Sequence, residues 1–199
     1  MLRVYGRPNS SNSAKVFWLL DELGEAYELI ATGRGYGATD TAEFRALNPF
    51  GKVPVVEDGA NVVWESNAVL RYLAGRAANP LWPQDAAGRS AADRWMDWVS
   101  MSFNPALTRL RKARSAGATE TPEDLAAVIR GAEALDQWLA DRAYLCGAGL
   151  TLADIVAAPA VYRWFRLPES ARPLPNLAAY HDRLAMHPGF RQHIRDALS

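Results

Sequence analysis

The spacing of apolar residues changes character once along this 199-residue chain. Over the first 80 residues short β-type runs alternate with helical ones, whereas from about residue 88 apolar residues recur every three or four positions, as in amphipathic helices. Asn79–Pro83 lies at the change and contains two prolines, which suit neither a helix interior nor a strand interior. The chain is therefore expected to form two domains, residues 1–78 and 88–199, joined by a linker at residues 79–87.

The first half begins with the pattern of a βαβ unit. Residues 2–5 and 27–30 have the composition of short strands, and they flank an amphipathic stretch at residues 14–23. Gly24 follows this stretch, in the position where glycine commonly ends a helix. The two strands are therefore expected to be parallel, with a right-handed crossover through the helix.

A hairpin between two helices is expected to complete this half. A short helix is predicted at residues 41–47, and the β-type runs 53–57 and 61–64 are joined through Asp58-Gly59, a strong hairpin signal. Ser66 is expected to cap the helix that follows. The first half is thus predicted to be a small mixed α/β sheet with helices on its faces, and the second half to be all-α.

Composition argues against several classes of function. Lys plus Arg and Asp plus Glu both number 22, so no basic face is indicated and nucleic acid is not an expected partner. No run of about 18 apolar residues and no secretory leader is visible, so we expect a cytoplasmic protein that does not enter a membrane. The single cysteine, Cys146, is interpreted as a buried structural thiol, and the three histidines near the C-terminus as surface residues, so no metal site is expected.

Three polar motifs in the first half could carry chemistry. The first is the loop before the first predicted helix, Pro8-Asn9-Ser10-Ser11-Asn12-Ser13. Serine and asparagine cap helices and form turns, and that structural role alone accounts for such a loop. A helix N-terminus surrounded by hydroxyl donors also favours an anion, including a thiolate.

The second motif is Asn48-Pro49-Phe50-Gly51-Lys52-Val53-Pro54, which leads into a predicted strand. A proline at this point suits a turn or a sheet edge, because it cannot donate to a strand ladder. If the bond before Pro54 were cis, the backbone of Val53 would be left to pair with an extended ligand.

The third motif is Trp64-Glu65-Ser66-Asn67-Ala68-Val69, at the start of a predicted helix. Beyond capping, such a helix start can hold a zwitterion. The backbone N–H groups and the Ser66 hydroxyl would take a carboxylate, while Glu65 would take an ammonium.

These motifs together resemble the N-terminal domain of the cytosolic glutathione transferases, and most closely that of bacterial members with an Asn-Ser-x-Asn loop before the first helix. In the second half, Thr151 and Asp154 resemble the family's capping box, whose role is in folding. The resemblance implies a thioredoxin-like α/β domain that binds glutathione, followed by an all-α domain that shapes a pocket for a second substrate.

The family's roles can be carried onto matching positions of this chain. Pro54 would follow a cis bond, and the backbone of Val53 would pair with the cysteinyl unit of glutathione. Lys52 would lie near a glutathione carboxylate, and Glu65 and Ser66 would hold the γ-glutamyl end.

The residue that stabilises the glutathione thiolate is left open between two positions. Serine-type classes place it six positions before a buried aliphatic of the first helix, which gives Ser10, whereas members that use asparagine place it at Asn12. Ser11 is an alternate. Tyr5 is interpreted as a packing residue, although other classes use a tyrosine near the start of the chain.

Roles in the second half are less defined. Pro105 is expected to kink its helix and to expose the inner face of that helix. Aromatic and polar residues of this half are therefore candidates for lining the second-substrate pocket, although their spacing is equally typical of core residues. The candidates are Trp98, Phe103, Asn104, Tyr162 and Phe165. The resemblance further implies a homodimer, in which Asp97 would reach the glutathione of the other copy.

The resemblance implies an enzyme that activates the thiol of its co-substrate glutathione for attack on a small hydrophobic electrophile, by conjugation or dehalogenation. Glutathione-dependent reduction of a disulfide or peroxide is an alternative, without a protein cysteine in the first domain. Isomerisation of an unsaturated diacid is disfavoured, because the family's isomerases usually carry a cysteine in this loop. A non-catalytic glutathione-binding interaction protein is the alternative outside enzymology.

Overall fold

The computed structural model describes residues 1–198, which form two compact units. One unit consists of Met1–Asn79 together with the segment that begins at Pro188, and the other is Pro80–His187. One boundary between the units lies after Asn79, and the C-terminal segment belongs with the first unit and not with the helical one. Each unit is described separately below.

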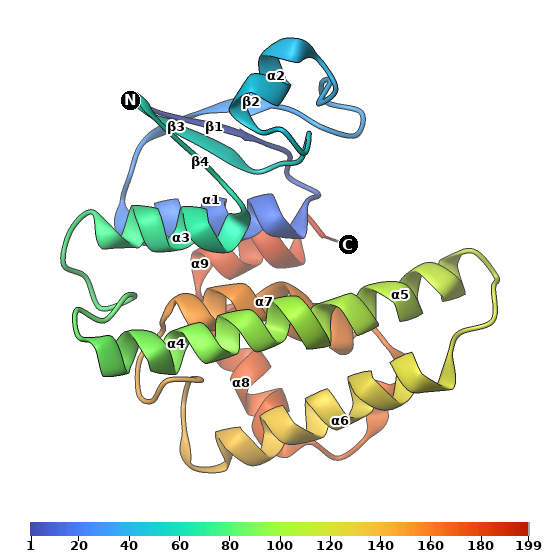
Figure 1. The fold of residues 1–199 in the computed structure, drawn as a ribbon. Helices are drawn as coiled ribbons and strands as arrows, with labels where there is room; N and C mark the ends of the chain where they lie inside the picture. Colours follow the sequence, from blue (N-terminus) through green and yellow to red (C-terminus); the bar gives the residue numbers. More distant parts are fainter. Residues whose placement is uncertain (199) are drawn as a thin grey trace. The chain divides into compact units, whose positions relative to one another are not determined.

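The first unit is built on a four-stranded sheet with the order β2-β1-β3-β4 (Figure 1). The central strand β1 pairs in parallel with β2 and antiparallel with β3, and β3 forms a hairpin with β4. Gly59 turns the hairpin with a φ of 62°, a conformation that glycine adopts without steric cost. The predicted βαβ unit and hairpin are therefore confirmed. The strands are β1 (Leu2–Gly6), β2 (Tyr27–Ala31), β3 (Val55–Asp58) and β4 (Asn61–Trp64).

Helices α1 (Ser11–Leu23) and α3 (Ser66–Gly75) lie side by side against one face of the sheet, and α2 (Ala42–Leu47) precedes β3 (Figure 1). Gly24 ends α1 with a φ of 65°, and its N–H group bonds to the carbonyls of Asp21 and Leu20. This left-handed stop confirms the predicted end of the helix.

The C-terminal segment packs onto α1, through the short helix α9 (Pro188–Phe190) and the π-helical turn η4 (Arg191–Arg195). Phe190 meets the Trp18 ring edge-on at 5.9 Å, and His193 Nε2 lies 2.6 Å from Asp21 Oδ2. His193 is only 9% exposed, so interpreting it as a surface residue was wrong. The helical period of this segment predicts an apolar face but does not say which partner covers it.

The second unit contains five longer helices and two short 3₁₀ segments, and its helices are labelled in Figure 1. Helix α4 continues through a π-helical turn, η1, directly into α5, and the winding of the helix changes just before Pro105, the residue expected to kink it. The elements are α4 (Ala86–Trp98), η1 (Val99–Phe103), α5 (Asn104–Ser115), α6 (Pro122–Trp138), η2 (Leu139–Asp141), α7 (Leu152–Trp164), η3 (Pro168–Ala171) and α8 (Pro175–Met186).

Helix α7 is buried along nearly its whole length, and its start is organised around Asp154, which has no exposed surface. The carboxylate accepts the N–H groups of Thr151 at 2.8 Å and Leu145 at 2.9 Å. It also accepts the hydroxyl of Tyr180 at 2.8 Å. The reciprocal capping box of Thr151 and Asp154 is confirmed, and its role is structural.

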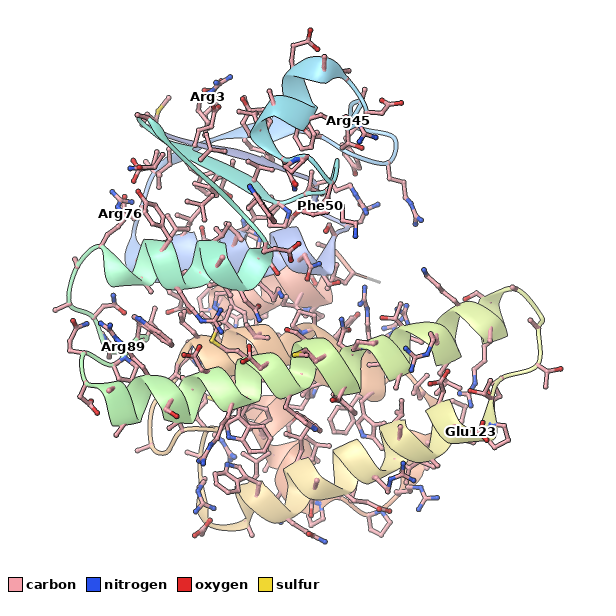
Figure 2. The ribbon with its side chains drawn as sticks, in the orientation of Figure 1. Arg3, Arg45, Phe50, Arg76, Arg89 and Glu123 are labelled. Carbon is pink, nitrogen blue, oxygen red and sulfur yellow. The ribbon has the colours of Figure 1, made fainter. Side chains whose placement is uncertain are left out.

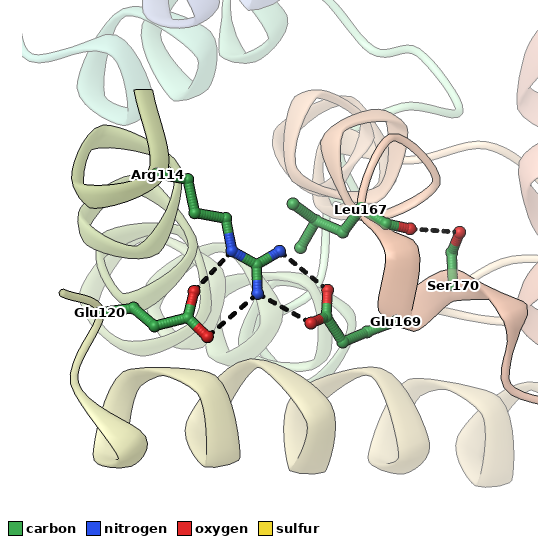
Figure 3. Close-up of polar contacts among 5 residues, drawn as sticks. All are labelled: Arg114, Glu120, Leu167, Glu169 and Ser170. Atoms are coloured by element: carbon green, nitrogen blue, oxygen red, sulfur yellow. Dashed lines mark hydrogen bonds and ion pairs between the residues drawn. The ribbon is translucent and has the colours of Figure 1, made fainter. Parts of the chain in front are cut away.

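A second polar cluster ties the end of α5 to two later segments (Figure 3). The guanidinium of Arg114 donates to Glu120 at 2.5 Å and to Glu169, in η3, at 2.7 Å. Because both carboxylates bind one planar guanidinium in fork-like pairs, this cluster fixes the loop before α6 and the turn after α7. None of the helices within residues 1–198 is both long and apolar enough to cross a bilayer.

Candidate functional site

The loop before α1 places Ser10 and Asn12 in different settings. Ser10 is the N-cap of α1, with extended backbone, and its Oγ accepts the N–H of Ser13 at 3.4 Å. It is 9% exposed, whereas Asn12 is exposed in the first turn of the helix. Since the Ser10 hydroxyl serves here as an acceptor, its own proton is left to donate.

Asn12 connects this loop to the third sequence motif. The hydroxyl of Ser66, in the first turn of α3, donates to Asn12 Oδ1 at 3.4 Å. Two motifs that lie 54 residues apart in sequence therefore meet at the starts of two adjacent helices. The N–H groups and positive dipole ends at the starts of both helices favour an anion here.

Glu65 occupies the N-cap position of α3, and Ser66 is the first helical residue, so the expectation that Ser66 caps this helix is wrong. Glu65 has a φ of 65° and makes no side-chain cap bond. A positive φ in a residue other than glycine is costly, and such outliers gather at binding sites. The exposed Glu65 carboxylate accepts no hydrogen bond from the described residues, which leaves it available to a ligand cation.

The second motif forms a shaped loop that enters β3. Asn48, 2% exposed, donates to the carbonyl of Lys52 at 2.8 Å and accepts the N–H of Phe50 at 3.1 Å. The Val53–Pro54 bond is cis, as the resemblance implied. The strand ladder begins at Val55, and within residues 1–198 the backbone of Val53 forms no hydrogen bond. Val53 thus offers its backbone groups to an extended ligand.

Lys52 is exposed beside this segment, and so is Phe50, which is labelled in Figure 2. The Phe50 ring packs edge-on against Trp64, with 5.4 Å between the ring centroids. The hydroxyl of Tyr5 donates to Glu57 at 2.6 Å, and burial together with this carboxylate raises the pKa of Tyr5. Tyr5 is therefore committed to the sheet, in keeping with its interpretation as a packing residue.

The sequence motifs did not identify Arg7 and Arg34. A Cβ atom added at Gly33 would lie 3.5 Å both from Arg7 Nε and from Val53 Cγ2, so Arg7 borders the loop segment that carries Val53. Burial, together with the charge of Arg34, lowers the pKa of Arg7, and neither arginine pairs with a carboxylate in the described chain. Isolated arginines in polar loops gave no signal in the sequence. Together they make this part of the unit attractive to an anion.

Lys15 was also missed. It is only 5% exposed, although it carries an ammonium group on α1, and its Nζ donates to Asn67 Oδ1 at 3.3 Å. Burial lowers the pKa of Lys15 to about 7, against the opposing effect of the Glu65 carboxylate. Lysine side chains are almost always exposed to solvent, so the burial of Lys15 could not be predicted from the sequence.

One of the candidates for a second-substrate pocket borders a cavity of the helical unit. Trp98 helps to line a cavity of about 340 Å³. Phe103, 2% exposed, stacks on the Trp98 ring at 5.3 Å. Asn104 has a buried side-chain oxygen that accepts no hydrogen bond from residues 1–198. The other residues lining the cavity are Arg94, Trp95, Ala134 and Trp138.

Three further residues of the second unit occupy varied settings. Tyr162 is 6% exposed, and Phe165 is half-buried against the ring of His181 at 4.6 Å. Asp97 is exposed on α4. The roles assigned to these residues and to Trp98, Phe103 and Asn104 stay predictions.

Neither a reactive cysteine nor a metal cluster is evident. The Sγ of Cys146 lies 3.6 Å from the carbonyl of Ala91, and burial raises the pKa of this thiol, which disfavours the thiolate. Among residues 1–198 no three His, Cys, Asp or Glu side chains gather as metal ligands would.

Comparison with known proteins connects this geometry to a family. The chain matches the family models "Glutathione S-transferase, N-terminal domain" over residues 1–75 and "Glutathione S-transferase, C-terminal domain" over residues 96–188. It is 34% identical over 212 residues to Glutathione S-transferase GstB of Escherichia coli (strain K12), and the match covers 100% of both chains. It is 33% identical to Glutathione S-transferase 3 of Zea mays, over 97% of this chain and 93% of that protein.

A solved structure gives a further comparison. The theta class glutathione S-transferase from the citrus canker pathogen Xanthomonas axonopodis pv. citri, crystallised with glutathione bound, is 39% identical to this chain. The two align with a TM-score of 0.84, over 100% of this chain and 99% of the other.

Proposed function

This chain belongs to the glutathione S-transferase family, and we propose that it activates glutathione at the joined starts of α1 and α3 for attack on a small hydrophobic electrophile. The observation that carries the proposal is the bond from Ser66 to Asn12 at 3.4 Å, which brings the thiolate candidates and the γ-glutamyl candidates together. The strained Glu65 and the unpaired backbone of Val53 support it.

Glutathione has three parts, and each finds a complementary group in this unit. The γ-glutamyl carboxylate would take the Ser66 hydroxyl and the N–H groups at the start of α3, and its ammonium would take Glu65. The cysteinyl unit would pair with the backbone of Val53. The glycyl carboxylate would meet the exposed Lys52, with Arg7 and Arg34 adding positive charge.

Activation requires a thiolate at neutral pH, although a free thiol has a pKa near 8.5. A hydrogen bond to a charged group contributes roughly 1.5–3 kcal/mol, and one pKa unit corresponds to about 1.36 kcal/mol. One donor together with the dipole of α1 is therefore sufficient to make the thiolate common at pH 7. We assign the donor to Ser10, whose hydroxyl proton is not used by the N-cap bond, with Asn12 second and Ser11 third.

The reaction is conjugation of an electrophile or displacement of a halide, in a role of detoxification in the cytoplasm. The second substrate would bind residues of the helical unit, with Trp98, Phe103, Asn104, Tyr162 and Phe165 as the proposed lining. We further propose a homodimer in which Asp97 reaches the glutathione of the other copy. The absence of a cysteine from residues 1–80 disfavours a reductase that works through a protein thiol.

The test combines binding with turnover. The protein is passed over immobilised glutathione and then assayed with glutathione and an aryl halide, an alkyl halide or a disulfide. We expect retention on the resin and turnover of a halide. If only the disulfide were reduced, the protein would be a glutathione-dependent reductase. If the protein were retained on the resin but turned over none of the substrates, it would be a non-catalytic glutathione-binding protein. Failure to bind glutathione would overturn the proposed site.

Ser66→Ala is the matched variant, because it removes a proposed ligand contact from a site whose neighbours stay in place. It should reduce retention on the resin and raise KM for glutathione about tenfold, with a smaller effect on kcat. Ser170→Ala is the control, since the Ser170 hydroxyl bonds to the carbonyl of Leu167 in η3 of the other unit (Figure 3). It should leave KM for glutathione unchanged.

A further inference from the structure

Lys15 is a buried cation with too few partners. Its side chain is 5% exposed, and its ammonium carries three N–H donors, of which one is used, toward Asn67 Oδ1 at 3.3 Å. No carboxylate of the described residues lies within ion-pair distance of it. A buried charge without a counter-ion is costly, so the group either loses its proton or acquires an anionic partner.

The position of Lys15 suggests where that partner would come from. Lys15 lies one turn after Asn12 on the same face of α1, and its acceptor, Asn67, follows Ser66 in the first turn of α3. The bonds from Ser66 to Asn12 and from Lys15 to Asn67 therefore form two successive links between the helix starts. An anion held at the start of α3 would lie beside this buried ammonium.

Other charged groups near α1 do not take this role. Glu65, which precedes α3, is the one side chain whose charge acts on Lys15 among the described residues. Asp21 of α1 is engaged with His193 of η4 at 2.6 Å, and Glu22 accepts the indole N–H of Trp18 at 2.8 Å. Arg71 and Arg76 follow Asn67 by one turn or more along α3, and Arg191 and Arg195 of η4 are cations as well, so none of the four can be the anionic partner.

We propose that Lys15 is a positioning residue of the glutathione site, which takes up a proton when the γ-glutamyl carboxylate binds beside it at the start of α3. This inference rests on the proposed function, because it concerns the same ligand. It adds a charged group that no sequence motif marks, and it makes glutathione binding depend on protons other than that of the thiol.

The sign of the effect follows from the surroundings of Lys15 within the protein itself. There the pKa of Lys15 is lowered to about 7 by burial, so at pH 7.5 most molecules hold a neutral amine. A carboxylate close to Asn67 favours the ammonium form and raises the pKa. The ammonium of the ligand has the opposite effect, but it would be held by Glu65, on the other side of Ser66, so the nearer carboxylate dominates. Binding should therefore take up protons at pH 7.5 and weaken as pH rises.

S-methylglutathione is the suitable probe, since it keeps both carboxylates and the ammonium but has no thiol to ionise. Isothermal titration calorimetry at pH 7.5, in two buffers of different ionisation enthalpy, measures the protons taken up. We expect on the order of half a proton per ligand for the unaltered protein and a clearly smaller uptake for Lys15→Met. From pH 6.5 to 8.5 the Kd of the unaltered protein should rise about fivefold more than that of Lys15→Met.

Two further variants separate charge from packing. Lys112→Met removes an exposed lysine of α5 and should leave proton uptake and Kd unchanged. Lys15→Arg keeps a charge that does not titrate in this range, and it should restore affinity without proton uptake. If circular dichroism shows that Lys15→Met is unfolded, Lys15→Arg takes its place, because a proton uptake that persists unchanged in a folded Lys15→Arg would equally exclude Lys15.

Binding of S-methylglutathione without proton uptake would overturn the role of Lys15 while leaving the proposed function intact. Absence of binding to the unaltered protein would overturn both. An uptake that persists unchanged in a folded Lys15→Met would assign the proton to another group and would also overturn the inference.

Discussion

Ser66 donates its hydroxyl hydrogen bond to Asn12 Oδ1 across 3.4 Å, and this contact joins the first turn of α3 to the first turn of α1. The consequence is that the two thiolate candidates are not equivalent. Asn12 already supports the residue that would hold the γ-glutamyl carboxylate, whereas Ser10 has no such link. A change at Asn12 therefore affects ligand binding even if it does not touch the sulfur.

Ser10→Ala should raise the pKa of bound glutathione by about one unit or more, because it removes a donor to the thiolate. The thiolate is followed by its ultraviolet absorbance as a function of pH. Asn12→Ala should raise KM for glutathione and shift the thiol pKa less. A larger shift of the thiol pKa in Asn12→Ala than in Ser10→Ala would identify Asn12 as the donor to the thiolate. If neither variant shifted this pKa, the donor would be Ser11 or a backbone N–H group.

Glu65→Gly should make the fold more stable and the site weaker. Glycine adopts a φ of 65° without the steric cost that Glu65 bears, and the gain should be up to about 1 kcal/mol in the free energy of unfolding. Loss of the carboxylate should weaken glutathione binding about tenfold or more. Urea denaturation and calorimetry measure the two effects. Glu65→Gln, which keeps the strain, should weaken binding without adding stability.

Arg114→Met should lower the free energy of unfolding at pH 7 by about 1 kcal/mol, a value reduced for partial solvent exposure. The hydrogen bonds from Arg114 lower the pKa of Glu169, so this stabilisation is present above the ordinary glutamate pKa and lost as pH falls through the depressed value. Urea denaturation should thus show a difference between the two proteins at pH 7 that shrinks below about pH 4.

The control for this cluster is Arg172→Met, which removes an exposed pair with Glu133 at 3.5 Å. It should change stability by a few tenths of a kcal/mol at most. A difference for Arg114→Met that stayed constant down to low pH would show that the arginine acts through packing and not through its charge.

Gly189→Ala should destabilise the protein by about 2 kcal/mol or more, because the added Cβ would lie 2.1 Å from Trp18 Cδ1. Both residues are deeply buried, so neither can move aside freely. Gly75→Ala, at the end of α3, meets no atom within 4 Å and should be neutral or slightly stabilising. Equal thermal midpoints for the two variants would contradict the tight packing of the C-terminal segment on α1.

Features that depend on neighbours in sequence could be predicted. Gly24 ends α1, Asp58-Gly59 turns the hairpin, and Thr151 caps α7 with Asp154, because each is a local conformational preference. The cap of α3 was predicted wrongly, because serine is a preferred N-cap residue, whereas here Glu65 occupies that position with a positive φ and Ser66 is the first residue of the helix.

Features that depend on distant contacts could not be predicted in this way. Lys15 is buried beside α3, and His193 is buried where the C-terminal segment packs on α1. The residues next to Lys15 and His193 in sequence do not indicate either contact. The binding motifs were found because several polar residues recur in a specific order. Arg7 and Arg34, which act as single charges in loops, had no such pattern.

The return of the chain at Pro188 makes the helical unit an insertion within the first unit, entered and left by two crossings of the chain. Segments that are far apart along the polypeptide, residues 1–79 and the segment from Pro188, therefore belong to the same unit. A fragment that stops near Asn79 would lack the cover over Trp18 that Gly189 and Phe190 provide, and its α1 would present that indole to water. The unit proposed to bind glutathione is thus completed only by the segment that follows the helical unit along the chain.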